Sequence, residues 1–581
     1  MFRESKRHLQ PVLISNVNDL PEKQKKRLEQ SWAGTFFREV FSRIPETLFA
    51  ELYSDIPSRP NVPVRFLVSL EFLKQNRGWS DEELYDEYTF GMQVRYAVGV
   101  HQLGEQDFDL RTLYYFRERL SRFAQEKGRD LITEAFEAMT DGQAKRLRIR
   151  LGKQRMDSVL ISSNIRRMSR LQLLVEVLQR VHRMLSEKDQ RGWEKDFAPY
   201  LEESSGKFVY RVKGQDVQEH LQAVGVLMIR LLKRLEKKYG KEPAYGVLER
   251  VFGEHFREGR KRIVVKGNGE LSAQSLQSPD DLEATYREKG GKGHQGYAAN
   301  VTETCDPKNE VQLITKVQVA PNSTDDSRFL AEAAPSLKAR TGVDKMHTDG
   351  AYGGPAVDTV LRAEGIQLRP TGIRGREPDP KRTHLADFRI YRDRQREPSS
   401  LCCPKGCRGE LRRIGRNGRY AVEFERKSCQ GCALLKQCKV VWGKREGKYR
   451  FTFSQEEAES ADRRRGMLKT RQLKRNLRAA VEATVRCLKL PFRGGKASVR
   501  GQPRMTQVVA ASAAMINVRR INRYEEMRRK EEEVKRRNAE RTEARQRKQA
   551  PGHAGRQLEL VSFLSFALRL RFFLFPRRCA V

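Results

Sequence analysis

The stretch RMDSVLISSN, residues 155–164, decides the fold because it joins an extended apolar pattern to a single carboxylate. Just before it, residues 147–151 read LRIRL, and this alternation has the two-residue period of a strand. We therefore expect extended chain to run through Asp157. The segment 145–155, KRLRIRLGKQR, holds six bases and no acid. In these surroundings Asp157 is either half of an ion pair or a ligand that holds a metal ion against a polyanion.

Segments further along the chain extend this strand into an α/β pattern. Strands are predicted at 296–303 and 311–320, a helix at 326–340, and a short strand within 342–354. The order strand, strand, strand, helix, strand predicts an α/β core. Asp349 stands in HTDGAYGG, at the carboxyl end of the last strand and before a Gly-rich turn. Carboxylates are therefore expected at the ends of the first and last strands.

The charge of the chain points to an acidic partner. Lys and Arg number 114 against 75 Asp and Glu, which leaves a net charge of +39 in 581 residues. DNA or RNA is the expected partner, and an anionic membrane surface is the rival. Apolar residues make up 38%, which excludes a disordered chain. Residues 1–10 are too polar for a secretory signal, and Glu559, Arg569 and Arg571 interrupt the apolar tract 558–575. We expect no membrane span and a cytoplasmic, nucleoid-associated protein.

Composition and periodicity divide the chain into six regions. Residues 1–60 are predicted as a lightly structured lead-in. Residues 61–140 are predicted as a helical domain that either binds DNA or forms a plain packed bundle. Within it, Ser80 and Glu83 form a predicted capping box. The other regions are a sheet core (145–164, 290–380 and 460–521), a helical insertion (165–265), a Cys-rich insertion (385–455), and a tail (522–581) that opens as a charged helix or a disordered segment.

A third candidate acid, Glu482, lies in RNLRAAVEATVRCLK, residues 475–489. At about 100° per residue, four side chains share one narrow face of the predicted helix: Arg475, Arg478, Glu482 and Lys489. Apolar residues occupy the adjoining face, which can pack on a sheet. One acid among three bases is typical of a metal ligand flanked by phosphate-binding cations. An ordinary Glu–Arg pair four residues apart is the alternative.

A basic segment leads directly into that helix. Residues 461–478 read ADRRRGMLKTRQLKRNLR, with eight bases and one acid, and 461–490 is predicted as a basic helix or helix pair. We expect Arg463, Arg464 and Arg465 to contact the phosphate backbone of DNA. A solvated charged face is the alternative.

Several blocks together resemble the bacterial insertion-sequence DDE transposases. Arg478, Glu482 and Lys489 have the spacing R-(3)-E-(6)-K and resemble the family's Tyr-(2)-Arg-(3)-Glu-(6)-Lys signature. MDSVLISSNIRRMSRL and HTDGAYGG look like its first-Asp and second-Asp segments, and FLVSLEFL, SDEELYDEY and DLRTLYYFRERL are similar to the N-terminal domain of one branch. The resemblance runs from about residue 60 to 520. Arg475 stands at the signature Tyr position, and a helical insertion lengthens the gap between the two Asp segments.

The resemblance implies a ribonuclease H-like core built on a mixed sheet. This core would cut DNA and join the freed ends without a covalent protein–DNA intermediate. Asp157, Asp349 and Glu482 would bind catalytic Mg²⁺ or Mn²⁺, and Arg478 and Lys489 would contact DNA near the cleaved end. The implied partners are the element's terminal inverted repeats and a target DNA, with a dimer in the reacting complex. Competing acids remain as alternatives, with Asp344 foremost: Asp325, Asp326, Asp344, Glu456 and Glu457.

Six cysteines form a cluster between the second Asp segment and Glu482. LCCPKGC occupies residues 401–407, and C-QG-C-ALLKQ-C follows at 429–438. Thiolates at this spacing are typical of a structural Zn²⁺ site that staples a small module. The family's pattern favours Cys403, Cys429, Cys432 and Cys438, and the alternative set replaces Cys438 with Cys407. An iron–sulfur cluster and unliganded thiols are further alternatives.

Three functions fit these observations. The first is a transposase that cuts element ends and joins them to target DNA by two-metal-ion chemistry. The second is an inactive, zinc-stabilised DNA-binding protein or repressor derived from a transposase. The third is a metal-dependent nuclease that hydrolyses DNA but does not join strands.

Overall fold

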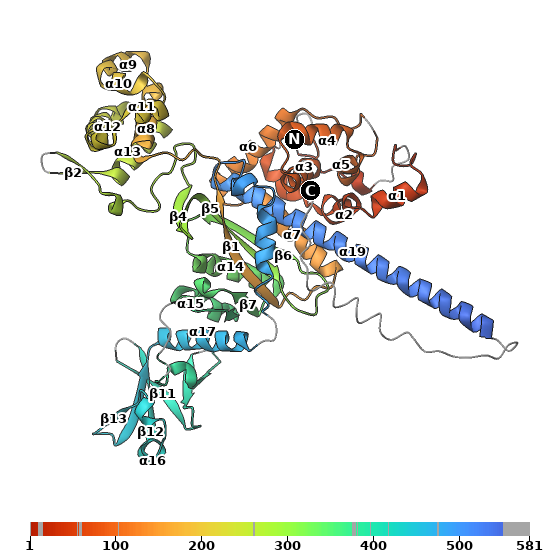
Figure 1. Ribbon diagram of the computed structural model, residues 1–581, viewed down its shortest axis with the longest axis vertical. Coiled ribbons are helices and arrows are strands. Elements are labelled where there is room, and N and C mark those ends of the chain that lie inside the picture. The colour runs from red at the N-terminus through yellow and green to blue at the C-terminus, as the bar shows by residue number, and fades with distance from the viewer. Residues whose placement is uncertain are drawn as a thin grey trace. The chain divides into compact units, whose positions relative to one another are not determined.

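A computed structural model describes most of the chain up to residue 549. The described residues are 2–9, 15–54, 56, 61–102, 104–259, 262–374, 379, 381–394, 397–415, 418–472 and 476–549. They belong to two compact units, Met1–Asn522 and Arg523–Val581 (Figure 1). The apolar tract predicted at 558–575 lies outside the described residues. Within them, no helix combines the length and the apolar character that crossing a membrane requires.

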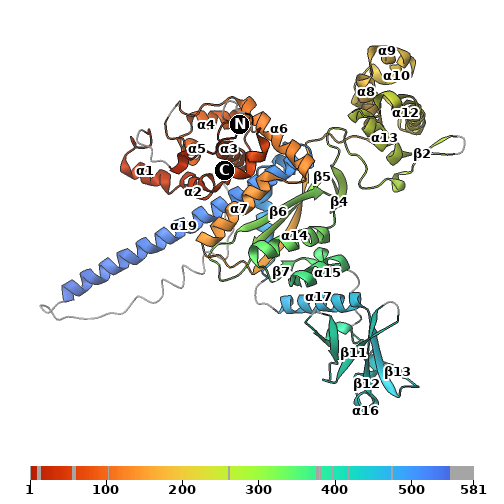
Figure 2. The same cartoon turned by 180° about the vertical axis from the view of Figure 1, so that it is seen from behind.

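A mixed six-stranded sheet lies at the centre of the first unit (Figures 1 and 2). β5 and β7 flank β1, with β5 antiparallel and β7 parallel to it, and β8 extends the sheet beyond β7. β5 is long enough to pair with β4 along its first half and with β6 along its second half. This arrangement confirms the predicted mixed α/β core. The strands are β1 (Lys153–Ser162), β4 (Thr285–Lys289), β5 (Lys292–Thr304), β6 (Ile314–Pro321), β7 (Lys345–Thr348) and β8 (Gln367–Pro370).

The first strand begins later than the alternating pattern predicts, so the prediction of a strand over 147–151 is wrong. The helix α7 (Leu131–Arg146) continues almost to this segment, and Arg148 has a left-handed φ of 52°. A left-handed residue cannot continue an extended chain, so the segment turns before β1 starts at Lys153. The alternating segment LRIRL therefore lies in the connection between α7 and β1.

Helices pack on both faces of β1, because successive side chains of a strand point to opposite faces. Met156 and Leu160 pack into a core formed with α14 (Asp326–Thr341) and α15 (Pro355–Glu364). Ile161 belongs to the core of the other face, together with Leu488 of α18 (Val481–Lys489). Odd-numbered residues of β1, including Asp157, therefore lie on the side of α18.

The N-terminal helices share one hydrophobic core with the sheet and with the first turns of α19 (Gln502–Gln549). The prediction of a lightly structured lead-in over residues 1–60 is wrong, because Phe36 and Phe49 are fully buried in this core. The predicted capping box is confirmed, with Ser80 and Glu83 each bonded to the other's backbone. The helices are α1 (Glu22–Glu29), α2 (Trp32–Glu39), α3 (Val64–Arg77), α4 (Asp81–Phe90), α5 (Met92–Ala97), α6 (Leu110–Lys127) and α7.

Between β1 and β4 the chain forms a helical bundle with a hydrophobic core of its own. Its helices lie where the helical periodicity of residues 165–265 predicts them. They are α8 (Arg170–Met184), α9 (Glu187–Gly192), α10 (Glu194–Leu201), α11 (Ser205–Arg211), α12 (Val217–Tyr239) and α13 (Pro243–His255), followed by the short strands β2 (Phe256–Glu258) and β3 (Ile263–Val265).

The Cys-rich region forms a second sheet with a small core, in the order β13-β14-β12-β11-β10-β9. Its elements are β9 (Arg389–Arg392), β10 (Pro398–Cys402), β11 (Arg408–Ile414), β12 (Arg419–Glu425), α16 (Arg426–Gln430), β13 (Val441–Gly443) and β14 (Lys448–Phe453). The chain then forms α17 (Gln455–Arg471) and α18, which is the predicted basic helix pair. In the second unit, the described part of α19 is almost entirely exposed and charged, as predicted for a solvated helix.

Candidate active site

Asp157 lies in the middle of β1, so its predicted place at a strand end is wrong. β1 extends five residues beyond Asp157 because its second half pairs with β5 as far as Ser162↔Gly296. The side chain is nearly buried, and burial raises the pKa of Asp157 above its ordinary value. The charge of Asp349 adds to this rise in pKa, while Arg478 and the backbone N–H of Ser158 oppose it. A buried carboxylate of this kind requires a cationic partner.

Asp349 follows β7 directly, as predicted. The parallel register pairs Arg155 with His347, and continuing it by two residues sets Asp349 beside Asp157. Asp349 caps the following turn, since its Oδ1 accepts a hydrogen bond from the N–H of Ala351 at 2.8 Å. Gly350 is required in this turn because a Cβ there would lie 2.8 Å from the backbone carbon of Gly372. The Gly-rich segment thus holds Asp349 against the edge of β1.

Glu482 lies in the first turn of α18, which begins at Val481. The helix predicted over 475–489 is therefore shorter than expected, and Arg478 lies in the turn before it. Val481, Val485 and Leu488 are buried, which confirms the predicted apolar face. Glu482 itself points outward, with 60% of its side chain exposed. The position of its carboxylate thus depends on where the helix backbone lies.

The Arg478 guanidinium brings the three predicted acids together. Its Nη2 lies 2.9 Å from Oδ2 of Asp157 and 3.8 Å from Oδ2 of Asp349. Its Nη1 lies 3.1 Å from Oε1 of Glu482. Three carboxylates that are far apart in the sequence therefore converge on one cation, and we call Asp157, Asp349 and Glu482 the acidic cluster. The ion pair predicted as one role of Asp157 is present, and its role as a metal ligand stays a prediction.

The chemistry of this cluster suits a divalent cation, although its present geometry does not form a closed metal site. Carboxylate oxygens are the ligands that Mg²⁺ and Mn²⁺ prefer, and they already surround a positive charge. Among the described residues, no group of three or more His, Cys, Asp or Glu side chains has the arrangement that holds a metal ion. Arg478 occupies the space between the carboxylates.

Four of the competing acids have other structural partners. Asp325 caps α14, and Asp326 accepts a hydrogen bond from Ser158 at 2.6 Å. Asp344 is exposed and lies 3.8 Å from Lys345. Glu457 completes a capping box at the start of α17. These contacts do not join the Arg478 cluster.

Lys489 lies in a concentration of positive charge at the far end of α18. Burial and the nearby Lys289 lower the pKa of Lys489. Burial lowers the pKa of His294, and the charges of Lys489, Arg167, Lys289 and Lys292 lower it further. The charges that act on His294 come from Lys489 of α18, from Lys289 and Lys292 of the β4–β5 hairpin and from Arg167, and we call these five residues the basic cluster. Arg475, also predicted to contact DNA, lies outside the described residues.

Comparison with known proteins identifies part of this chain. Residues 402–522 match the family model described as "Transposase DDE domain". Over these residues the chain is similar to a transposase DDE domain. This match supports the resemblance to insertion-sequence DDE transposases, and the family implies DNA as the partner. No curated protein and no solved structure matches the chain. The matched DDE-domain segment contains Arg478, Glu482 and the cysteine cluster, while Asp157 and Asp349 lie outside it.

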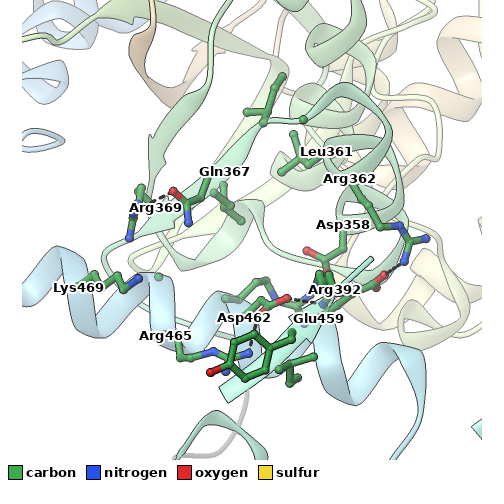
Figure 3. A pocket seen from close by; sticks show the side chains of 17 residues that line it. Asp358, Leu361, Arg362, Gln367, Arg369, Arg392, Glu459, Asp462, Arg465 and Lys469 are labelled. Carbon is green, nitrogen blue, oxygen red and sulfur yellow. Dashed lines mark hydrogen bonds and ion pairs between the residues drawn. The ribbon is translucent and has the colours of Figure 1, made fainter. Parts of the chain in front are cut away.

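Within the DDE-domain segment, two of the three arginines predicted to contact DNA form internal ion pairs. Arg463 pairs with Asp358 of α15, and Arg465 lies 2.5 Å from Asp462 and also donates to the carbonyl of Phe388. They line a cavity of about 580 Å³ between α15, β8 and α17 (Figure 3). Arg464 is half-buried. The ion pairs of Arg463 and Arg465 contribute to local structure, and a DNA-binding role for the three arginines stays a prediction.

The cysteines of the DDE-domain segment gather at one end of the second sheet. Four of them line a cavity of about 30 Å³: Cys403, Cys429, Cys432 and Cys438. Burial and neighbouring thiols, Cys407 and Cys438 foremost, raise the pKa of Cys429 to about 11. Thiols at close quarters around a small cavity have the donor chemistry of a Zn²⁺ site, although the arrangement stops short of a closed metal geometry. Both predicted ligand sets therefore remain open.

Glu303 is a further site residue that the sequence analysis missed. It lies on β5, directly opposite Arg155 of β1, and its side chain is fully buried. Its contacts with Arg155, Arg520 and Thr484 connect β1, α19 and α18. A signal exists in the sequence, because Glu303 is the one charged residue in the stretch GYAANVTET, residues 296–304, and a buried acid requires partners.

Proposed function

We propose that this protein is a DNA transposase that cuts the ends of its element and joins them to target DNA. The convergence of Asp157, Asp349 and Glu482 on Arg478 carries this proposal, because a DDE enzyme requires three carboxylates from distant segments at one point. The mixed sheet around β1 is compatible with the ribonuclease H-like core that the family implies.

Asp157, Asp349 and Glu482 would hold the divalent cations. Two bound Mg²⁺ or Mn²⁺ ions would activate the attacking oxygen and stabilise the leaving oxygen of the phosphodiester. β1 and the Gly350 turn fix the first two carboxylates, and α18 delivers the third. Arg478 would then be available to bind a phosphate near the cleaved end, as its place in the family signature implies.

The basic cluster around Lys489, at the other end of α18 from Glu482, would bind the DNA backbone. It has cations on α18, on the β4–β5 hairpin and after β1, and their mutual repulsion is relieved when phosphates bind between them. A Zn²⁺ ion held by four of the clustered cysteines would stabilise the second sheet. The reacting complex would hold two element ends and at least two subunits.

Cleavage of end-containing DNA by the full-length protein with Mn²⁺ tests this proposal. Asp157→Ala and Glu482→Ala should abolish cleavage and leave DNA binding intact. Asp344→Ala is the matched control, because this exposed acid lies five residues before Asp349 and should be dispensable. If the first two variants cleave like the wild type, the site assignment is wrong.

A target plasmid separates transposition from the two other functions. Joined products identify a transposase, whereas cleavage without joining identifies a nuclease. Binding of the ends without metal-dependent cleavage identifies a repressor.

A further inference from the structure

Glu303 is a fully buried carboxylate with several charged and polar partners and no solvent contact. Its Oε1 accepts a hydrogen bond from Nε of Arg155 at 2.6 Å, and its Oε2 accepts one from Nη1 of Arg520 at 2.7 Å. Oε2 also accepts a hydrogen bond from the Thr484 hydroxyl at 2.8 Å. A buried charge with this many donors is stable only while all its partners stay in place.

These partners connect to the backbone that carries the candidate active site. Nη1 of Arg155 donates to the carbonyl of Leu477 at 2.7 Å, which holds the turn immediately before Arg478. Arg520 of α19 donates both to Glu303 and to the Thr484 hydroxyl. Thr484 belongs to α18 and is itself buried. The network therefore fastens α18 and its preceding turn to β1 and β5.

Each of these contacts is made by a residue one or two positions in the sequence from Arg478 or from a member of the acidic cluster. Arg155 precedes Asp157 by two positions on the same face of β1, Leu477 adjoins Arg478, and Thr484 follows Glu482 by two positions. Among the described residues, the largely exposed side chain of Glu482 forms its ion pair with Arg478 alone. Its carboxylate is thus placed by the backbone of α18 more than by its own packing.

We propose that Glu303 is a positioning residue that, through Thr484 and Arg155, locks α18 so that Glu482 and Arg478 face Asp157. The effect of this network on catalysis rests on the proposed function, whereas its effect on the position of α18 does not. The network acts through backbone position, because Glu303 is too deeply buried to reach substrate or metal.

Thr484→Val tests the proposal with little change in side-chain volume, and Thr484→Ser is the matched control that restores the hydroxyl. Hydrogen exchange of the full-length protein measures the lock directly. The amides of 477–482 should exchange about fivefold faster in Thr484→Val, the equivalent of one ordinary hydrogen bond. They should exchange at the wild-type rate in Thr484→Ser, and the amides of β1 should be unchanged in both.

Metal titration then separates positioning from a loss of stability. The electron paramagnetic resonance signal of free Mn²⁺ gives the Mn²⁺ concentration that half-saturates the protein. We expect this concentration to rise about fivefold in Thr484→Val. A loss of folded protein alone would lower the number of sites without changing the half-saturating concentration.

The outcomes are distinct. Wild-type exchange and wild-type Mn²⁺ affinity in Thr484→Val would overturn the lock. Faster exchange with unchanged Mn²⁺ affinity would overturn its role in positioning. A wild-type protein that binds no Mn²⁺ would contradict the proposed function, while the exchange measurement would still decide whether the lock exists. Glu303→Gln, which removes the charge from the same network, should reproduce the effects of Thr484→Val in larger measure.

Discussion

Arg478 occupies the position between three carboxylates where a divalent cation would bind. A guanidinium within 2.9 to 3.8 Å of all three acids competes with any metal ion for their charge. We predict that Arg478→Gln binds Mn²⁺ about tenfold more tightly than the wild type, because the competing charge is gone. Arg486→Gln is the control, since it removes an exposed arginine from the same helix. Weaker Mn²⁺ binding in Arg478→Gln would mean that Arg478 assembles the acids and does not compete with the metal.

At the scale of single residues, the family signature and the Gly-rich turn point to two acids that the structure brings together at Arg478. Glu482 and Arg478 stand four residues apart in a recognisable signature, and Asp349 precedes a Gly-rich turn. The mid-strand position of Asp157 could not be predicted, because the length of β1 depends on its pairing with β5. Glu303 has no spacing signal, and its partner Arg520 is 217 residues away.

Among the elements, α13 carries a titratable group whose state depends on pH. Nδ1 of His255 accepts a hydrogen bond from Nε of Arg170 at 3.0 Å, which requires a neutral ring. Burial, with the charges of Arg170 and Lys266, lowers the pKa of His255 to about 4. The unfolded chain binds the extra proton near pH 6.5, so stability is complete above that pH and is lost as the pH falls toward 4.

We therefore predict that the helical bundle loses up to about 1 kcal/mol of stability per pH unit in this window. His255→Gln should show a smaller loss between pH 7 and pH 5, as measured by denaturant unfolding followed by circular dichroism. An equal loss in both proteins would assign the pH dependence to other groups.

The capping box of α4 gives a prediction for a single helix. Ser80→Ala removes the bond from the N–H of Glu83 to the Ser80 hydroxyl, at 3.0 Å, and should cost about 1 kcal/mol. Ser204→Ala is the control, because Ser204 precedes α11 without a capping hydrogen bond from its side chain. The midpoint of thermal unfolding should fall in Ser80→Ala and should hardly change in Ser204→Ala. Equal midpoints would show that α4 is held by packing alone.

The elements themselves were largely predictable, because hydrophobic periodicity and caps are local signals. The errors occurred where local pattern and tertiary context disagree. LRIRL alternates as a strand does, but the left-handed Arg148 turns the chain there. Residues 33–41 have no strong signal by themselves, yet Phe36 is fully buried because the N-terminal helices pack on a core shared with distant segments.

The Cys-rich module combines the donor chemistry of a Zn²⁺ site with a small hydrophobic core. Its core consists of few buried side chains, so a bound Zn²⁺ would contribute much of its stability. We predict about one Zn²⁺ per chain by elemental analysis, lost in Cys429→Ser. Cys402→Ser should retain it, since Cys402 does not line the cavity of the four thiols. Cys407→Ser decides between the two ligand sets, because loss of zinc in this variant would favour the set that includes Cys407.

The excess of positive charge over the whole chain predicts a strong salt dependence of DNA binding. Each neutralised phosphate releases a counterion, so affinity for DNA should fall about 10³- to 10⁵-fold between 50 and 200 mM salt if six to ten phosphates are bound. Lys489→Gln and Lys289→Gln should each lower the slope of log affinity against log salt by about one, because both lie in the basic cluster. Lys233→Gln should leave the slope unchanged, since this exposed lysine already pairs with Glu258 at 3.1 Å. An unchanged slope in the first two variants would mean that DNA binds at a surface away from α18. The phosphodiester would then have to approach Asp157, Asp349 and Glu482 from another side.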